Sequence, residues 1–140
     1  MPIAIIDITT EQKDKILKFD EGHFLDLKAI QIAPNKLSRH ISAFANADGG
    51  EMYVGISEDS ITNTREWAGF SNPEAANAHL QVFEKLFPLS QEFSYNFLKC
   101  KDTKGLVLQL GINKTKDIKK STDGKPYIRR GAQSLSIDTA

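Results

Sequence analysis

A tight Asn-Ala-Asp-Gly-Gly turn at residues 46–50 constrains the fold of this chain more than any other feature. Before the turn, apolar residues recur at helical spacing through residues 41–45. After it, apolar residues alternate through residues 52–56, as they do in a buried strand. Because Gly49 and Gly50 can adopt positive φ angles, the chain can reverse here within very little space. The sequence therefore predicts a helix that turns back directly into a buried strand.

Apolar periodicity and capping residues predict the other elements. Helices are expected at residues 11–19, 34–47 and 72–87, the last with Asn72 as its N-cap. Strands are expected at residues 3–8, 24–30, 51–56, 92–101, 105–113, 127–131 and 134–137. Residues 61–71 read as a loop, and residues 114–123 as a polar, mobile segment. This order predicts an α+β fold in a single domain over residues 1–140, with a mixed β-sheet and about three helices packed on it.

Composition places the chain among globular proteins. It has 140 residues, of which 40% are apolar and 26% are charged. Cys100 is the only cysteine, which excludes a disulfide within the chain and a cysteine-based zinc site. The first residues lack the basic region of a signal peptide, and no apolar run approaches the roughly 18–20 residues of a membrane helix. We therefore expect a cytoplasmic protein that does not enter a membrane.

Charge is distributed unevenly along the chain although the formal net charge is zero. Residues 1–98 hold 8 Lys or Arg and 14 Asp or Glu, whereas residues 99–130 hold 10 Lys or Arg and 3 Asp. A basic segment of this kind can bind a polyanion by releasing its counterions. The other interpretation, which the sequence leaves open, is a solvated lysine-rich surface.

Acidic side chains flank the central turn on both sides. Within the strand expected at residues 24–30, Asp26 and Lys28 share a face about 7 Å apart, and Glu21 lies just before the strand. Glu58 and Asp59 follow the next strand. Paired carboxylates could hold Mg²⁺ or Mn²⁺ while the lysine contacts a polyanion. A surface ion pair without chemistry is the alternative. The three histidines, His23, His40 and His79, show no metal-ligand spacing and are interpreted as surface or core residues.

Three segments resemble the Schlafen AlbA-like family, also called AlbA_2 and described as a divergent AAA-type domain. AFANADGGEMYVGI at residues 43–56 is similar to its central signature, in which Asn46, Gly49 and Gly50 are structural. EGHFLDLK at residues 21–28 is similar to its E-x-x-x-x-E-F-K element. KPYIRRG at residues 125–131, followed by Ser134, resembles its Y-x-R-x-G-S/T segment. The resemblance covers about residues 19–137. It implies that the last segment returns beside the Gly-Gly strand and brings Arg129 near the acidic side chains.

The resemblance also implies an active site, because nuclease members of the family use three carboxylates. Carried over by motif, these are Glu21, Asp26 and Glu58, with Asp59 close behind as a further metal ligand. Asp26 departs from the family's glutamate by one methylene, and the third position aligns with Ser57 or Glu58. A bound Mg²⁺ or Mn²⁺ would activate water and polarise a phosphodiester. The nucleic-acid backbone would be held by Lys28, Lys114, Lys116, Lys119, Lys120, Arg129 and Arg130. Arg129 has a second interpretation, as the partner of one of the carboxylates.

Three functions follow from these observations. The first is a nucleic-acid-binding domain directed to RNA, with metal-dependent endoribonuclease activity; one domain alone suggests a homodimer that builds a wider groove. The second is a non-catalytic DNA-binding, regulatory or protein-interaction module. The third, nucleotide (ATP) binding, is disfavoured because the chain has no G-x-x-x-x-G-K-[ST] motif and because Glu51 after the glycines would repel a phosphate.

Overall fold

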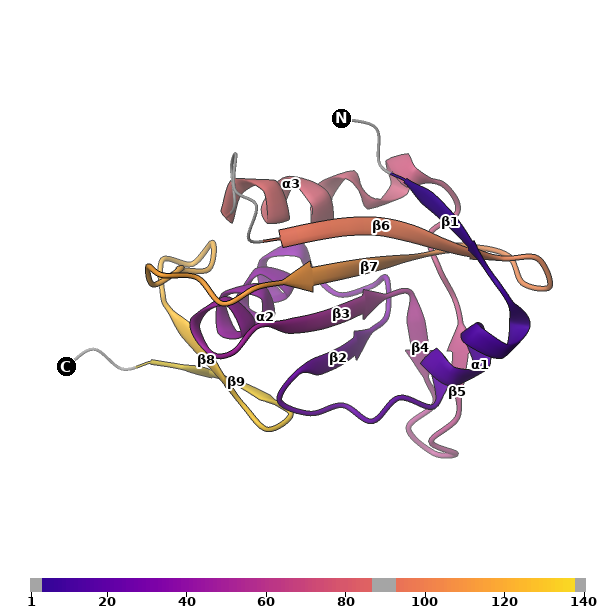
Figure 1. Ribbon diagram of the computed structural model, residues 1–140, viewed down its shortest axis with the longest axis horizontal. Coiled ribbons are helices and arrows are strands. Elements are labelled where there is room, and N and C mark those ends of the chain that lie inside the picture. Colours follow the sequence, from indigo (N-terminus) through magenta and orange to yellow (C-terminus); the bar gives the residue numbers. More distant parts are fainter. Residues whose placement is uncertain (1–3, 87–92, 138–140) are drawn as a thin grey trace.

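A mixed five-stranded sheet organises the molecule (Figure 1). The computed structural model describes residues 4–86 and 93–137, apart from the side chain of Leu86. The strands lie in the order β1-β6-β7-β3-β2. The two outer pairs, β1 with β6 and β2 with β3, are parallel, and the central pairs are antiparallel. The bounds are Ile5–Ile8 for β1, Leu25–Lys28 for β2, Gly50–Val54 for β3, Phe93–Cys100 for β6 and Leu106–Ile112 for β7.

Three helices accompany the sheet, which confirms the expected α+β fold. Helix α1 (Thr10–Leu17) begins with a capping box between Thr9 and Gln12. Helix α2 (Pro34–Asn46) has a proline in its first turn, and α3 (Asn77–Leu86) continues from a 3₁₀ turn, η1 (Pro73–Ala76). The expected end of the last helix at residue 87 and the expected start of a strand at residue 92 lie outside the described residues.

The two faces of the sheet are covered differently. Helices α2 and α3 cover one face and bury Leu37, Ile41 and Phe83 against the strands. On the other face, Ile16 of α1 and Trp67 pack over a second, smaller cluster. Trp67 belongs to β5 (Arg65–Trp67), which pairs with β4 (Ile56–Glu58). The loop expected at residues 61–71 therefore contains a strand, because burial of Trp67 draws that part of the chain back to the sheet.

The Asn-Ala-Asp-Gly-Gly turn joins α2 to β3 as the sequence predicts. Gly49 has a φ of 79°, and a side-chain carbon at this position would lie 2.6 Å from the carbonyl oxygen of Ile112. A carbon on Gly50 would lie 2.6 Å from the ring of Phe44. Both distances are too short for a side chain, so the turn requires glycine on steric grounds.

A C-terminal hairpin lies apart from the main sheet. Strands β8 (Tyr127–Arg130) and β9 (Gln133–Ser136) pair with each other and pack on α2 (Figure 1). The hairpin therefore does not return beside β3 as a further strand of the sheet, which corrects the expectation drawn from the resemblance. No helix in the described part of the chain is long and apolar enough to cross a membrane.

Candidate functional site

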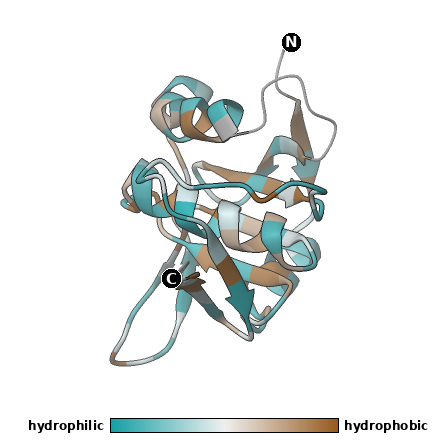
Figure 2. Cartoon of the chain, turned by 90° about the vertical axis from the view of Figure 1, so that its left-hand side faces the viewer, coloured by the Kyte–Doolittle hydropathy of each residue, from teal (hydrophilic) through white to brown (hydrophobic). Residues whose placement is uncertain are grey.

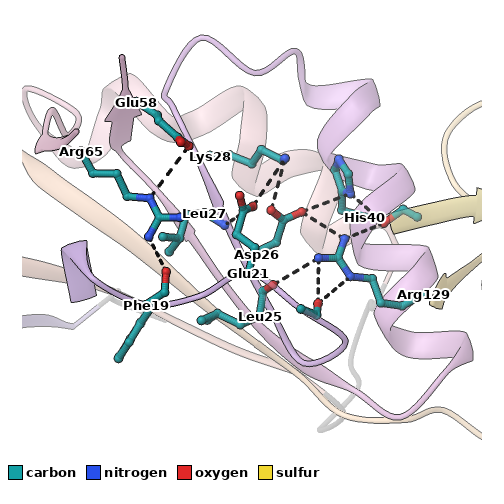
Figure 3. Close-up of polar contacts among 12 residues, drawn as sticks. Phe19, Glu21, Leu25, Asp26, Leu27, Lys28, His40, Glu58, Arg65 and Arg129 are labelled. Carbon is teal, nitrogen blue, oxygen red and sulfur yellow. Dashed lines mark hydrogen bonds and ion pairs between the residues drawn. The ribbon is translucent and has the colours of Figure 1, made fainter. Parts of the chain in front are cut away.

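A buried carboxylate, Asp26, lies at the centre of the charged groups that the sequence singled out (Figure 3). Its side chain is 2% exposed, and its Oδ2 lies 3.2 Å from Nη1 of Arg129 and 3.5 Å from Nδ1 of His40. Its Oδ1 lies 3.2 Å from Nζ of Lys28. Glu21 lies beside Asp26. Its Oε2 accepts a hydrogen bond from the backbone amide of Leu27 at 3.2 Å and lies 4.0 Å from Nζ of Lys28. We call Glu21, Asp26, Lys28, His40 and Arg129 the Asp26 cluster.

Three elements bring the Asp26 cluster together. In β2, alternation places Asp26 and Lys28 on one face, as predicted, and this is the face that α2 covers. Helix α2 contributes His40, and β8 contributes Arg129 from more than 100 residues along the chain. The sequence did not indicate His40, because a lone histidine in a helix is usually a surface residue. Its signal is its position on α2 one turn before Phe44, which also contacts Arg129.

Arg129 has a structural role in this geometry. Its side chain is 0% exposed and donates five hydrogen bonds, at 2.9–3.2 Å, to the carbonyl oxygens of Gly22 (twice) and Leu25, to Asp26 and to Ser134. Its guanidinium also lies 4.7 Å from the ring centre of Phe44. A side chain with no exposed surface cannot contact a phosphate of a bound nucleic acid, so Arg129 is the partner of a carboxylate rather than a backbone contact.

Two neighbouring carboxylates raise the electrostatic cost of the site. Burial raises the pKa of Glu21, and the hydrogen bond and negative charge of Asp26 raise it further. Oδ1 of Asp26 is buried and accepts no hydrogen bond from any residue that the structure describes, although Nζ of Lys28 lies 3.2 Å away. That contact is an ion pair without a well-directed hydrogen bond. An additional cation or hydrogen-bond donor at Oδ1 of Asp26 would stabilise the two neighbouring carboxylates, Glu21 and Asp26.

His40 is neutral near pH 7. Burial, together with the positive charges of Lys28 and Arg129, lowers its pKa to about 4. Its contact with Asp26 at 3.5 Å is therefore not a salt bridge at neutral pH, and its Nδ1 hydrogen-bonds with Oγ of Ser134 at 2.7 Å instead.

The low pKa of His40 makes the stability of the domain depend on pH. The native state binds fewer protons than the unfolded state between the unfolded pKa of 6.5 and the folded pKa of about 4, so stability is expected to fall as pH decreases through this window. A shift of this size corresponds to about 3 kcal/mol across the window. Urea unfolding of wild type and His40→Asn at pH 7.0 and 4.5 measures it. Equal losses of stability in the two proteins would contradict the assignment.

Glu58 at the end of β4 and Asp59 directly after it bond to partners outside the Asp26 cluster. Oε2 of Glu58 lies 3.9 Å from Nε of Arg65, and Oδ1 of Asp59 accepts from the backbone amide of Ile61 at 2.8 Å. Among residues 4–86 and 93–137, no group of three His, Cys, Asp or Glu side chains is placed to hold a metal ion. The structure therefore brings Glu21 and Asp26 together but does not add Glu58 or Asp59 to them.

Residues 114–130 form a surface segment with seven Lys or Arg, which we call the basic segment. Its exposed cationic side chains are Lys114, Lys116, Lys120, Lys125 and Arg130, whereas Lys119 is half-buried. Figure 2 views the molecule from this side, where the loops that cross in front are mainly hydrophilic. The residues predicted to contact a nucleic-acid backbone therefore differ in exposure: most of the lysines are exposed, Lys119 is half-buried and Arg129 is buried.

The basic segment is tied to α2, although its composition suggested a mobile segment. The side chain of Asn46 bonds to two parts of this segment. Its Oδ1 accepts a hydrogen bond from the Lys119 backbone amide at 2.7 Å, and its Nδ2 donates to the carbonyl oxygens of Lys119 and Tyr127, both at 2.8 Å. Ser42 donates to the Lys119 carbonyl at 2.7 Å, and Thr115 bonds to the end of α2. The signal in the sequence was the stripe Ser38, Ser42 and Asn46, whose spacing of four puts three polar side chains on one helix face.

Comparison with solved structures supports the fold. The chain is similar to the N-terminal domain of a protein from Nitrosomonas europaea whose name relates it to the ATP-dependent DNA helicase RecG. The TM-score is 0.60 at 18% identity, over 94% of this chain and 92% of that one. It is also similar to the DIP2311 protein from Corynebacterium diphtheriae, with a TM-score of 0.60 at 15% identity. That match covers 91% of this chain but 29% of the other, so the chain spans less than a third of that protein. The search of curated proteins found no match.

Fold and site together define a small α+β domain in which a buried carboxylate cluster lies beside a fixed basic surface segment. The chain belongs to the family described as Schlafen, AlbA_2, which matches residues 21–138. This match confirms the resemblance drawn from the three sequence motifs.

Proposed function

We propose that this domain binds nucleic acid, and RNA in particular, through the basic segment. The observation that carries the proposal is that the hydrogen bonds of Asn46 and Ser42 hold a run of exposed lysines against α2. A fixed array of cationic groups loses less entropy on binding a phosphate backbone than a mobile one does. Family membership and the DNA helicase in the name of the Nitrosomonas europaea protein support nucleic-acid binding in general.

Salt dependence of binding tests the proposal. Lys114→Gln/Lys116→Gln/Lys120→Gln is expected to weaken binding to a labelled single-stranded RNA about tenfold or more at low salt, because three phosphate contacts are lost. The slope of log affinity against log salt should fall by about 2. Fluorescence anisotropy at several salt concentrations measures both.

A matched control separates position from net charge. Lys99→Gln/Lys101→Gln/Lys104→Gln removes three exposed lysines at the opposite end of β6 and β7 and changes the net charge equally. Equal weakening by the two triple variants would contradict a binding site on the basic segment. Duplex DNA of the same length, measured in parallel, separates RNA from DNA as the substrate. Sedimentation of the same samples tests the expected homodimer.

Metal-dependent cleavage of RNA is the second candidate, favoured by the Glu21 and Asp26 pair. Two adjacent carboxylates, one with a buried oxygen that accepts no hydrogen bond within the described part of the chain, supply two of the oxygen ligands that Mg²⁺ or Mn²⁺ prefers. When bound, such an ion would polarise the phosphodiester and activate water. Lys28, at the edge of the Asp26 cluster, would hold the phosphate beside it. The proposal concerns these two carboxylates, since Glu58 pairs with Arg65.

Calorimetry with Mn²⁺ tests this second candidate without relying on activity. Wild type is expected to release heat on titration, and Glu21→Gln, which keeps the shape of the side chain, should bind at least tenfold more weakly. Glu58→Gln is the control and should bind as wild type does. No heat with wild type and no cleavage of a hairpin RNA would overturn the catalytic candidate, and the domain would then be a non-catalytic binder.

A further inference from the structure

We propose that a pocket at one end of the sheet holds an unpaired base of single-stranded nucleic acid, with guanine preferred; the inference rests on the proposed function and deepens it. The pocket has a volume of about 570 Å³ and lies where β3 begins and β7 ends. Its lining includes Phe24, Asp48, Glu51, Ser94, Asn113 and Lys114. We call it the Phe24 pocket.

Phe24 is placed as a stacking platform. The residue is 60% exposed, which is unusual for a phenylalanine whose backbone is hydrogen-bonded to the sheet. Its carbonyl oxygen accepts from the Glu51 amide at 2.9 Å, which ties it to the start of β3. The His23 ring lies 4.8 Å from it at 88°, and Nε2 of His23 lies 2.6 Å from Oδ2 of Asp48. The Phe24 ring therefore packs against a ring that is itself held by Asp48. Stacking of a base on an exposed aromatic ring is a general mode of single-strand binding.

Glu51 supplies the polar side of the pocket. Its Oε2 accepts from the Tyr53 hydroxyl at 2.9 Å, and this hydroxyl accepts from Gln109 at 3.0 Å. Gln109 in turn accepts from Asn96 at 3.0 Å, so a chain of hydrogen bonds across β3, β7 and β6 orients the carboxylate. Burial and Glu51 raise the pKa of Tyr53 to about 12, so its hydroxyl stays a donor at neutral pH.

A smaller hollow continues the Phe24 pocket across this face of the sheet. It has a volume of about 140 Å³ and shares Glu51, Ser94 and Gly111 with the Phe24 pocket. No hydrogen bond of the Ser94 hydroxyl is found among the described residues. This part of the sheet carries polar groups, and none of the helices that the structure describes covers it (Figure 1). A planar polar ring can therefore lie across it.

The chemistry of the lining selects the ligand. A carboxylate only accepts hydrogen bonds, and guanine presents two adjacent donors, N1–H and the N2 amino group, on its Watson–Crick edge. Adenine and uracil each present one donor there. The negative charges of Asp48 and Glu51 exclude a phosphate from the inner part of the pocket, so the backbone has to run past Lys114. Lys114 begins the basic segment, which makes the pocket and the phosphate track continuous.

The test compares two RNAs, two variants of the pocket and one control variant. The RNAs are a 12-mer of uridines and the same 12-mer with one central guanosine. Wild type is expected to bind the guanosine RNA more tightly, and Phe24→Ala should weaken binding of that RNA about tenfold. Glu51→Gln should reduce the ratio of the affinities for the guanosine RNA and the uridine RNA toward one, while the salt dependence of binding stays unchanged. Glu58→Gln, an exposed acid on another element, is the control and should behave as wild type. NMR spectra confirm that each variant is folded.

The outcomes distinguish this inference from the proposed function. If wild type binds both RNAs in a salt-dependent way, and Phe24→Ala and Glu51→Gln change nothing, the pocket holds no base and this inference is wrong while the proposed function stands. If wild type binds neither RNA, the proposed function is wrong and the inference with it. Perturbation of the Gly50 and Gly111 amides by guanosine monophosphate, and not by uridine monophosphate, would support the pocket independently of the basic segment.

Discussion

Arg129→Met is expected to destabilise the domain by about 3–5 kcal/mol, because it removes the charge that compensates a buried carboxylate. The substitution keeps the length of the side chain but leaves Asp26 without its strongest partner. It also leaves the carbonyl oxygens of Gly22 and Leu25 without three hydrogen bonds. Lys28 cannot replace Arg129, because it approaches the other carboxylate oxygen. Urea unfolding followed by the fluorescence of Trp67 measures the loss.

Arg130→Met is the matched control for this prediction. Arg130 is the next residue in β8, and its side chain is exposed. Its replacement should change stability by no more than about 0.5 kcal/mol. It should instead weaken RNA binding, since Arg130 belongs to the basic segment. Wild-type stability in Arg129→Met would contradict the structural role given to Arg129. If Arg130→Met destabilised the protein as much as Arg129→Met, the effect would belong to the strand and not to the buried ion pair.

The sequence was sufficient to predict that Asp26 and Lys28 share one face of β2. Alternation along β2 placed Asp26 and Lys28 on one face, and the structure finds their charged atoms 3.2 Å apart. The Gly-Gly turn and its need for glycine could also be predicted. Both features depend on the backbone conformation of a few neighbouring residues. For Arg129 the sequence left two roles open, and its distance of 103 residues from Asp26 explains why: only the packing of β8 on α2 decides between them.

Elements that depend on distant packing could not be predicted. β5 is a strand because Trp67 is buried over the second core cluster, and its local sequence carries no alternating pattern. The basic segment has the composition of a mobile loop, yet its backbone groups bond to Asn46 and Ser42. Polar residues on a buried helix face, such as Ser42 and Asn46, indicate that a backbone segment bonds to them, but the sequence does not identify that segment. His40 was missed for the same reason.

Asn46→Ala is expected to destabilise the domain by about 2–4 kcal/mol and also to weaken RNA binding, although it changes no charge. The side chain satisfies three backbone groups of the basic segment, the amide and carbonyl of Lys119 and the carbonyl of Tyr127. The Lys119 carbonyl keeps its bond from Ser42, so the loss falls mainly on the Lys119 amide and the Tyr127 carbonyl. Each buried group left unsatisfied costs about 1–3 kcal/mol, and part of this cost is recovered if the segment moves away to meet water. Release of the segment would scatter the lysines through which we propose that the domain binds a phosphate backbone.

The double effect distinguishes Asn46 from an ordinary stabilising residue. Asn35→Ala, in the first turn of the same helix, removes a local hydrogen bond to the Lys36 amide and should change neither property by much. Asn46→Asp keeps the bond from the Lys119 amide but places a carboxylate against two carbonyl oxygens, so it should be at least as damaging as alanine. Unfolding and anisotropy measurements on the same preparations decide. If Asn46→Ala lost stability but bound RNA with wild-type affinity at a temperature where it is folded, the fixed position of the lysines would not matter for binding, and the basic segment would act by its net charge alone.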